Sequence, residues 1–355
     1  MLKTIAGKLE SGRELNCQDA LFLLRRADLL EAGRLAAAMR RRLHPQGRVT
    51  FVVDRNVNYT NICVTGCRFC AFYRKPDHAD AYLLSHQEIL DKVAELAASG
   101  GTQLLLQGGL HPELRIAWFE ELFRSLRRHF PQVQIHSLSP AEVVHLAAQS
   151  ELSVATCLLR LKAAGLASLP GGGAEILVDR VRRRVSPDKI SWRVWVGVME
   201  TAHRLGLPGT ATMVFGIGET DEDLVTHLLR VRALQQRTGG FSAFIPWSYQ
   251  PGNTELGGEQ ATGMDYLRVL AVSRLVLHNI PNLQASWVTQ GGKMAQVALF
   301  FGANDLGGTM LEENVVAAAG ARFRLDREEL LALIREAGFI PARRTTGYDI
   351  LEEYF

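Results

Sequence analysis

The chain has 355 residues, of which 47% are hydrophobic and 22% are charged, and its formal net charge is +3. This composition is ordinary for a globular protein and excludes disordered, collagen-like and disulfide-rich classes. So small a net charge gives no reason to expect nucleic acid or an anionic membrane as a partner, and no stretch approaches the roughly 18 apolar residues of a membrane span. The N-terminal sequence lacks an apolar core of signal-peptide length, so we expect a cytoplasmic protein.

Residues 1–46 are predicted to form a helical extension, because apolar residues from Ala20 to Met39 recur at helical spacing. Short apolar runs then alternate with longer amphipathic ones over residues 47–310. The predicted strands are Val49–Val53, Val57–Ile62, Gln103–Gln107, Val133–Ser137, Leu166–Leu169, Thr210–Phe215, Phe241–Ile245, Leu283–Val288 and Val297–Phe301. The predicted helices are Ser85–Ser99, Ile116–Phe130, Pro140–Ala148, Ser191–Leu205, Glu222–Thr238 and Met264–His278. Residues 311–355 are predicted to be a second helical extension, packed on the region before them.

The repeated order of strand and helix predicts an α/β protein with a parallel sheet, most simply closed as a TIM-type (β/α)8 barrel. Polar and glycine-rich stretches follow several of the predicted strands, for example Gln107–Pro112 and Phe215–Thr220. In a barrel these stretches are the loops at the carboxyl ends of the strands, where active sites are built. The distribution therefore indicates an enzyme.

Three of the five cysteines, Cys63, Cys67 and Cys70, have the spacing C-x3-C-x2-C directly after a predicted strand. Cysteine thiolates are the usual ligands of iron–sulfur clusters, and a short loop with three of them leaves the fourth iron of a 4Fe–4S cluster open. A structural zinc site is the alternative, but it normally needs four closed ligands, and no second CxxC pair is present. The triplet therefore predicts a cluster site, with Cys17 and Cys157 as bystanders.

The run from Cys63 to Cys70, C-V-T-G-C-R-F-C, resembles the signature of radical S-adenosylmethionine (SAM) enzymes. The resemblance implies that the open iron binds SAM, and that reduction by a donor such as flavodoxin or ferredoxin cleaves SAM to methionine and a 5′-deoxyadenosyl radical. That radical abstracts a hydrogen atom from the substrate, so the cofactor supplies the chemistry and the protein orients the substrate. The residues that the resemblance assigns to SAM are Phe69, Phe72, Gln107, Gly108, Gly109, Ser139, Glu175 and Gly216.

Each of these assignments has a structural alternative. Gly108 and Gly109 also fit a plain turn, and Phe69 and Phe72 also fit the core. Ser139 before Pro140 is an ordinary helix N-cap followed by proline at the first helical position. Glu175 also fits a partner at a helix N-terminus.

Further segments extend the resemblance along most of the chain. They include Asn58–Ile62, Gly171–Glu175, Gln284–Gly291 and Gly302–Asp305. Together they resemble the radical SAM cyclases that form cyclic dehypoxanthinyl futalosine on the futalosine route to menaquinone. Aminofutalosine synthases and the radical SAM enzymes that make the deazaflavin of coenzyme F420 share some of these segments and remain alternatives. A non-catalytic iron–sulfur or zinc-binding protein is the alternative of a different class.

The cyclase resemblance implies a nucleoside-like substrate whose ribose loses the C4′ hydrogen to the 5′-deoxyadenosyl radical. The carbon radical then attacks the benzoate ring, and loss of one electron and one proton gives the spirocyclic product. Candidate substrate contacts, which alternate along strands or follow them, are Tyr59, Trp247, Gln284, Ser286 and Thr289. His136 and Asp305 are candidate catalytic residues, although a lone buried histidine is as often structural.

Overall fold

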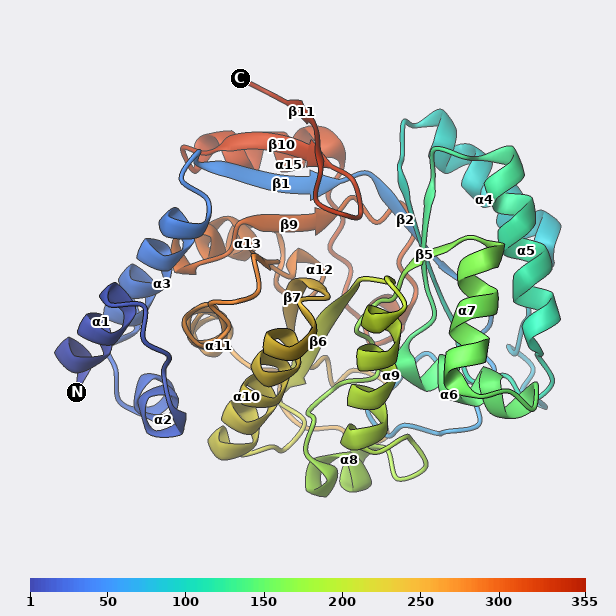
Figure 1. Ribbon diagram of the computed structural model, residues 1–355, viewed down its shortest axis with the longest axis horizontal. Helices are drawn as coiled ribbons and strands as arrows, with labels where there is room; N and C mark the ends of the chain where they lie inside the picture. The colour runs from blue at the N-terminus through green and yellow to red at the C-terminus, as the bar shows by residue number, and fades with distance from the viewer.

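The computed structural model describes all residues, 1–355, and has a barrel of parallel strands at its centre (Figure 1). The bridges Leu169–Gly209 and Gln284–Asp305 join the parts of the ring, and β9 pairs with β1 (Arg48–Val52), which leads directly into β2. The predicted closed barrel is therefore confirmed. Its eight strands follow one another in sequence order: β2 (Asp54–Asn58), β3 (Gln103–Gln107), β4 (Gln134–Ser137), β5 (Leu166–Ser168), β6 (Gly209–Phe215), β7 (Phe241–Ser248), β8 (Asn282–Leu283) and β9 (Asp305–Gly308).

All the predicted helices of the barrel are present, and most begin at a side chain that caps them. Four of these caps are Ser85, Ser139, Thr220 and Thr262. In each, the cap hydroxyl accepts a hydrogen bond from the backbone N–H of the third helical residue, and the carboxylate of that residue accepts one from the backbone N–H of the cap. None of the helices is long and apolar enough to cross a membrane. The helices are α4 (His86–Ala98), α5 (Ile116–His129), α6 (Pro140–Gln149), α7 (Val154–Ala164), α8 (Asp179–Val185), α9 (Trp192–Arg204), α10 (Asp221–Thr238) and α11 (Gly263–Val276).

Helices α7 and α8 have no counterpart among the predicted helices, and three predicted strands are wrong in part or in whole. The prediction Val57–Ile62 covers only the end of β2, which stops at Asn58. The prediction Leu283–Val288 covers only the end of β8, because residues from Trp287 onward form the helix α12 (Trp287–Gln290). Val297–Phe301 is not a strand but the end of α13 (Gly292–Ala298) followed by a 3-10 turn. A short buried apolar run fits a helix as well as a strand, so the pattern alone did not separate them.

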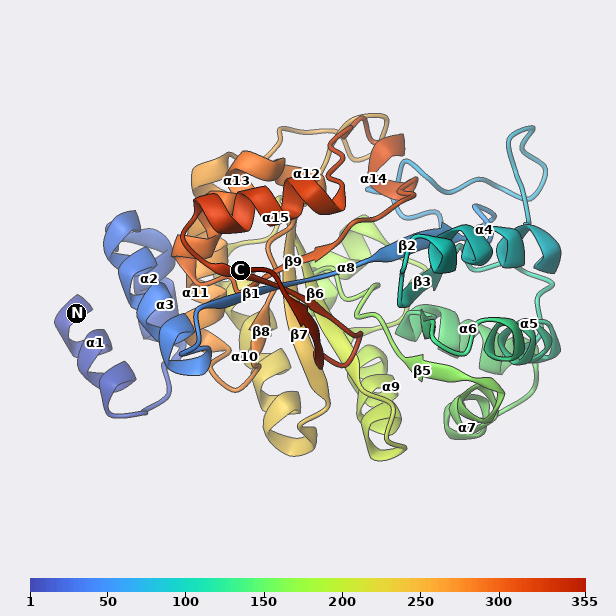
Figure 2. The ribbon, with the colours of Figure 1, turned by 90° about the horizontal axis from the view of Figure 1, so that it is seen from above.

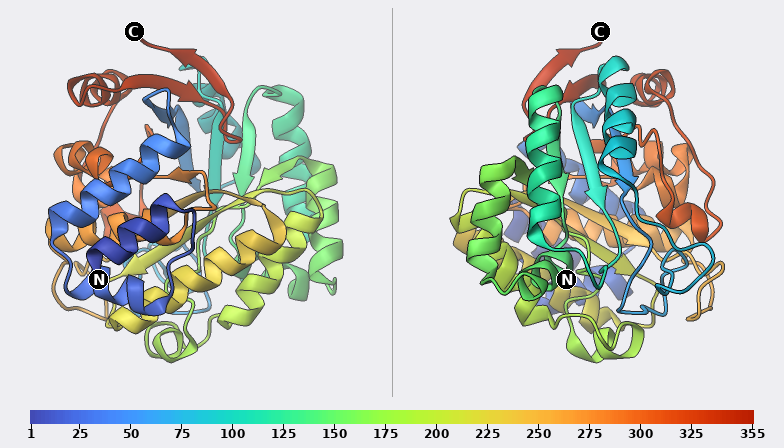
Figure 3. Two further views of the ribbon diagram at one scale, coloured as in Figure 1. Left: turned by 60° about the vertical axis from the view of Figure 1, so that its left-hand side comes forward. Right: turned by 90° about the vertical axis from the view of Figure 1, so that its right-hand side faces the viewer.

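The N-terminal extension is helical, as expected, and consists of α1 (Leu2–Glu10), α2 (Cys17–Arg25) and α3 (Leu29–Leu43). Helix α3 packs on α11 and α2 packs on α10, so the extension covers one flank of the barrel (Figure 3).

The C-terminal segment, residues 311–355, is not purely helical as predicted. After α14 (Val315–Ala318) and α15 (Arg327–Glu336) it forms β10 (Ile340–Arg344) and β11 (Ile350–Glu353). Strand β10 pairs in parallel with β1, and β11 returns antiparallel to β10. Figure 2 shows this hairpin in front of the barrel strands, beside β1. The sequence did not predict β10, because Arg343 and Arg344 are basic residues that usually lie on the surface. Arg344 is buried here only because it forms the ion pair described below.

Candidate active site

A cavity of about 320 Å³ occupies the barrel and reaches from the cysteine loop to the turn between β10 and β11. Side chains alternate along a strand, so every second residue faces inward. Barrels of this type are usually filled by bulky apolar side chains, whereas here polar residues surround open space. Alternate residues of three strands illustrate the lining: Asp54, Asn56 and Asn58 on β2, Gln103, Leu105 and Gln107 on β3, and Thr210, Thr212 and Val214 on β6.

The loop after β2 brings the three predicted cysteines to one end of this cavity. None of them is in a disulfide, and the hydroxyl of Thr65 lies 3.0 Å from the sulfur of Cys63 and 3.5 Å from that of Cys67. Burial, followed by the neighbouring Cys67, raises the pKa of the Cys70 thiol. No three His, Cys, Asp or Glu side chains are grouped to hold a single metal ion, as a closed zinc site requires. Three sulfurs spread along one loop suit a cluster, in which each thiolate binds a different iron.

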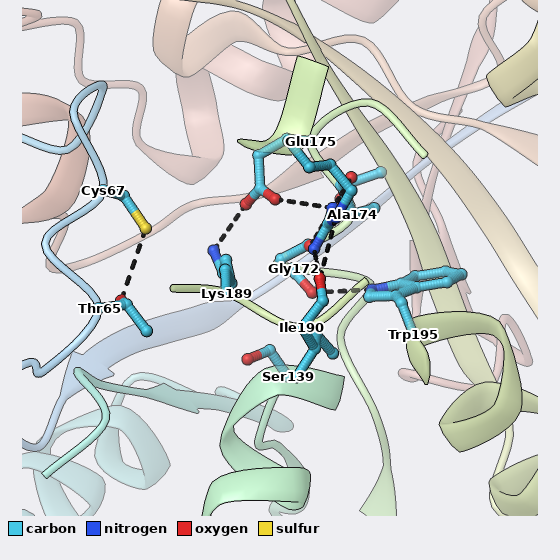
Figure 4. A network of polar contacts seen from close by, with 12 residues as sticks. Thr65, Cys67, Ser139, Gly172, Ala174, Glu175, Lys189, Ile190 and Trp195 are labelled. Atoms are coloured by element: carbon cyan, nitrogen blue, oxygen red, sulfur yellow. Dashed lines mark hydrogen bonds and ion pairs between the residues drawn. The ribbon is translucent and has the colours of Figure 1, made fainter. Parts of the chain in front are cut away.

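A buried ion-pair network lies beside the cysteine loop (Figure 4). The Glu175 carboxylate accepts hydrogen bonds from Lys189 Nζ at 2.7 Å and from Arg182 Nη1 at 3.1 Å. Burial alone would lower the pKa of Lys189, but the Glu175 carboxylate and the Cys67 sulfur outweigh it, so this pKa is raised. Burial would likewise raise the pKa of Glu175, yet Lys189 and Arg182 hold it below its usual range. The network thus fixes a positive charge near Cys67, suited to an anionic ligand.

Gly108 and Gly109 follow β3, and both line the cavity. A Cβ on Gly108 would lie 2.7 Å from the ring of Tyr59, and one on Gly109 would lie 2.1 Å from the carbonyl oxygen of Ile62. The loop after β2 packs directly against this turn. Both positions therefore need glycine for packing, whether or not their backbone also approaches a cofactor.

Glu142 connects the glycine turn to the start of α6. Its carboxylate accepts hydrogen bonds from the Tyr59 hydroxyl at 2.9 Å, from Gly108 N at 3.0 Å and from Ser139 N at 2.7 Å. Ser139 and Glu142 line the cavity. Tyr59 does not line the cavity, because β2 ends one residue earlier, at Asn58. The Tyr59 ring packs instead against Phe119, with 5.3 Å between the ring centres. Tyr59 therefore supports the cavity wall in this structure, and its contact with the substrate stays a prediction.

His136, a candidate catalytic residue in the sequence, lines the cavity from β4. Its Nδ1 lies 2.6 Å from the Ser168 hydroxyl, while its Nε2 has no protein hydrogen-bond partner. Burial, helped by the nearby Arg344, lowers the pKa of His136 to about 3. The ring is therefore neutral at pH 7 and offers a hydrogen-bonding nitrogen to the cavity.

Asp305 is fully buried and does not line the cavity. Its two oxygens accept hydrogen bonds from Arg344 Nε at 2.6 Å and Nη2 at 3.0 Å, from the Thr50 hydroxyl at 2.5 Å and from Gly307 N at 2.8 Å. The carboxylate is therefore saturated by protein donors, and a catalytic role for it stays a prediction. It positions Arg344, which does line the cavity and whose guanidinium lies 3.8 Å from the ring centre of Tyr348.

Three other predicted residues lie outside the cavity. Ser286 and Thr289 hydrogen-bond to each other at 2.9 Å around the start of α12, and Gly216 N donates to Glu219 at 2.6 Å. The predicted residues that do line the cavity are Cys63, Cys67, Phe69, Cys70, Phe72, Gln107, Gly108, Gly109, His136, Ser139, Glu175, Trp247 and Gln284. Sequence reasoning missed several lining residues that lie in no recognisable pattern: Asp54, Asn56, Lys189, Arg344, Thr346 and Tyr348.

Comparison with known families agrees with this fold and this cysteine loop. Residues 57–231 match the model of the radical SAM superfamily, and residues 238–354 match that of the CofH/MqnC C-terminal region. The chain belongs to the radical SAM superfamily and is an enzyme of that class.

Similar proteins with two different named activities are found. The chain is 46% identical to the cyclic dehypoxanthine futalosine synthase of Halalkalibacterium halodurans, over 99% of this chain and 96% of the relative. It is 45% identical to that of Streptomyces coelicolor, over 99% and 89%. It is also 44% identical to the 5-amino-6-(D-ribitylamino)uracil–L-tyrosine 4-hydroxyphenyl transferase of Methanothermobacter thermautotrophicus, over 91% and 90%.

Among solved structures, methylornithine synthase (PylB) superposes with a TM-score of 0.76 at 19% identity, covering 96% of this chain and 97% of that one. The FeFe-hydrogenase maturase HydG from Carboxydothermus hydrogenoformans superposes with a TM-score of 0.75 at 17% identity, covering 98% and 80%. At such low identity the likeness establishes a shared fold.

Proposed function

We propose that this protein is the cyclase that converts dehypoxanthinyl futalosine to its cyclic form in menaquinone formation. The observation that carries the proposal is 46% and 45% identity to two synthases of that name over 99% of the chain, N-terminal helices included. The cavity in the barrel agrees with it, because it joins a loop of three cysteines to a polar chamber.

In this proposal Cys63, Cys67 and Cys70 hold a 4Fe–4S cluster at the mouth of the barrel. When bound there, the cluster and SAM supply a 5′-deoxyadenosyl radical that takes the C4′ hydrogen of the substrate. Lys189 and Glu175, with the other predicted SAM residues that line the mouth, hold SAM and its charges. The barrel wall below excludes water and orients the substrate, and this positioning is the main task of the protein in such chemistry.

His136 and Gln284 belong to the substrate chamber in this scheme. With its Nδ1 proton directed to Ser168, the His136 ring presents a neutral Nε2 that accepts a hydrogen bond from the substrate. Its low pKa suits this positioning role better than storage of the proton that leaves the ring. Trp247 lines the same chamber, where its indole can pack on the benzoate. A flavodoxin or ferredoxin as donor and a cytoplasmic location complete the proposal.

The test is anaerobic incubation of the reconstituted, reduced enzyme with SAM and dehypoxanthinyl futalosine. The proposal expects free 5′-deoxyadenosine and a product two hydrogens lighter than the substrate, in line with the loss of one hydrogen atom, one electron and one proton. An adenosyl adduct would instead identify an aminofutalosine synthase. Failure to cleave SAM under reduction would identify a non-catalytic protein.

A second candidate function rests on the 44% identity to the archaeal transferase. Incubation with 5-amino-6-(D-ribitylamino)uracil and L-tyrosine tests it under the same conditions. Formation of a hydroxyphenyl-linked product there, with no turnover of dehypoxanthinyl futalosine, would replace the first proposal with the second.

A further inference from the structure

A buried hydroxyl lies between two of the three cysteine sulfurs. Thr65 is 5% exposed, and its Oγ1 lies 3.0 Å from Cys63 Sγ and 3.5 Å from Cys67 Sγ. Figure 4 shows this hydroxyl directed at the Cys67 sulfur. A threonine hydroxyl commonly bonds to a neighbouring backbone group, but here the two sulfurs are its only hydrogen-bond partners.

The backbone of the cysteine loop fixes this hydroxyl in place. Cys63 N donates to Arg74 O at 3.0 Å before it, and Arg68 N donates to Val185 O at 2.9 Å after it. Between these two anchors Gly66 has φ +51°, a left-handed conformation that glycine adopts without strain and that lets the loop turn. The contact between hydroxyl and sulfurs is therefore built into the folded loop.

The direction of the hydrogen bond follows from the state of the sulfurs. A thiolate has no proton, so once Cys63 and Cys67 bind iron as thiolates the hydroxyl of Thr65 is the donor, to one sulfur at a time. Hydrogen bonds to the sulfurs are among the factors that set the reduction potential of an iron–sulfur cluster. The reduced state carries one more negative charge, so a donor beside the thiolates stabilises it more than the oxidised state and raises the potential.

The surroundings of Cys67 strengthen this effect. Cys67 is 6% exposed, so little water competes for its sulfur, and a hydrogen bond in such a buried place is stronger than one in water. The positive charge of Lys189 lies near the same sulfur, which is one cause of the raised pKa of Lys189. The charge and the hydroxyl therefore both favour added negative charge at this point of the loop.

We propose that Thr65 is a positioning residue that donates a hydrogen bond to the Cys63 or Cys67 thiolate and thereby raises the reduction potential of the cluster. The inference rests on the proposed function for the presence of the cluster, and it goes beyond that function by assigning a task to a residue between the first two ligands. It holds for either candidate reaction, because both require a reduced cluster.

Two variants separate the hydroxyl from the shape of the side chain. Thr65→Val keeps the shape and removes the hydroxyl, whereas Thr65→Ser keeps the hydroxyl and removes the methyl group. The measurement is an anaerobic redox titration of the reconstituted enzyme without substrate, followed by the EPR signal of the reduced cluster. In Thr65→Val we expect the equilibrium constant for reduction to fall about tenfold, which is a midpoint potential about 59 mV more negative for one electron. In Thr65→Ser we expect the wild-type potential.

A matched control changes the neighbouring residue in the same loop. The side chain of Val64 is 49% exposed, so the hydroxyl introduced by Val64→Thr lies in water, and we expect it to leave the potential unchanged. Iron content is measured for every variant. If Thr65→Val takes up less iron than the wild type, Thr65→Ala is titrated in its place as a second side chain without a hydroxyl. Loss of the cluster in both, with a full cluster in Thr65→Ser, would support the positioning role.

Three outcomes would overturn the inference. One is a wild-type potential in Thr65→Val, and another is an equal shift in Thr65→Val and Thr65→Ser, which would assign the effect to altered packing of the loop. A wild-type protein that takes up no 4Fe–4S cluster would refute the ligand assignment, and the inference with it. By contrast, an enzyme with the expected potentials that cleaves SAM and leaves dehypoxanthinyl futalosine unchanged would support the role of Thr65 and refute the proposed function.

Discussion

The two ends of the barrel cavity are built in opposite ways. At the mouth, Cys63, Cys67 and Cys70 come from one short loop, next to the fixed positive charge of Lys189. At the opposite end, the closed end beside the turn between β10 and β11, the Thr50 hydroxyl donates to Asp305 across 255 positions of sequence, and Asp305 in turn binds Arg344. A local loop is recognisable before the chain folds, whereas the closed end exists only after β1, β9 and β10 have paired.

The difference extends to the ligands that each end suits. Lys189 keeps its charge beside a cysteine sulfur, so the mouth favours anionic groups such as thiolates or a cofactor carboxylate. At the closed end Asp305 neutralises Arg344, so this end offers no net positive charge to a ligand. The comparison predicts that changes at the mouth abolish the chemistry, while changes at the closed end alter stability and substrate affinity.

The largest effect is expected at the mouth. Cys63→Ala, Cys67→Ala or Cys70→Ala each removes one of only three cluster ligands, so we expect complete loss of cluster absorption and of SAM cleavage after anaerobic reconstitution. Cys17→Ala and Cys157→Ala are the controls, because Cys17 is exposed on α2 and Cys157 is buried on α7, both away from the cavity. Retained absorption in any variant of the triplet would refute the ligand assignment.

The next largest effect concerns the ion pair at the closed end. The side chains of Arg344 and Asp305 are 4% and 0% exposed. Arg344→Met leaves the Asp305 carboxylate buried without its partner, which costs about 3–5 kcal/mol of unfolding free energy. The double variant Arg344→Met with Asp305→Leu removes both charges and should recover most of that loss. Urea denaturation measures both, and a single variant as stable as wild type would show that the pair is not required.

Asp54 gives the closed end a pH dependence. Burial raises the pKa of Asp54 from 3.8 to about 6. The folded protein thus keeps this proton up to a higher pH than the unfolded chain does, so the stabilising contribution is full below pH 3.8 and is lost as the pH rises through about 6. Asp54→Asn does not titrate. We expect the stability of wild type relative to this variant to fall by about 2–3 kcal/mol between pH 4 and pH 7, measured by urea denaturation. A constant difference across that range would contradict the shift.

The same contrast explains what the sequence could and could not predict. The strand–helix order, the cysteine loop and the glycine turn depend on neighbouring residues, and the structure has all three. The predicted strand that contains Ser286 is wrong, because β8 has only two residues and the chain turns into α12. Arg344 was missed because a basic run is typical of a solvated surface, and only the pairing of β10 with β1 buries it. Which side chains face the cavity, and which distant strands pair, depend on the whole closed barrel and cannot be predicted from one segment.

The smallest effects are expected for Tyr59, which lies behind the cavity wall, and for Trp247, which lines the cavity. Tyr59→Phe removes the hydroxyl that donates to Glu142 at 2.9 Å and keeps the ring behind Gly108. We expect a loss of about 1 kcal/mol in stability and no change in the Kd of SAM or substrate. Trp247→Phe is the matched opposite, because its Nε1 has no partner to lose and its residue lines the cavity. It should keep the stability and weaken substrate binding. If Tyr59→Phe weakened substrate binding at unchanged stability, Tyr59 would belong to the substrate chamber and not to the support behind its wall.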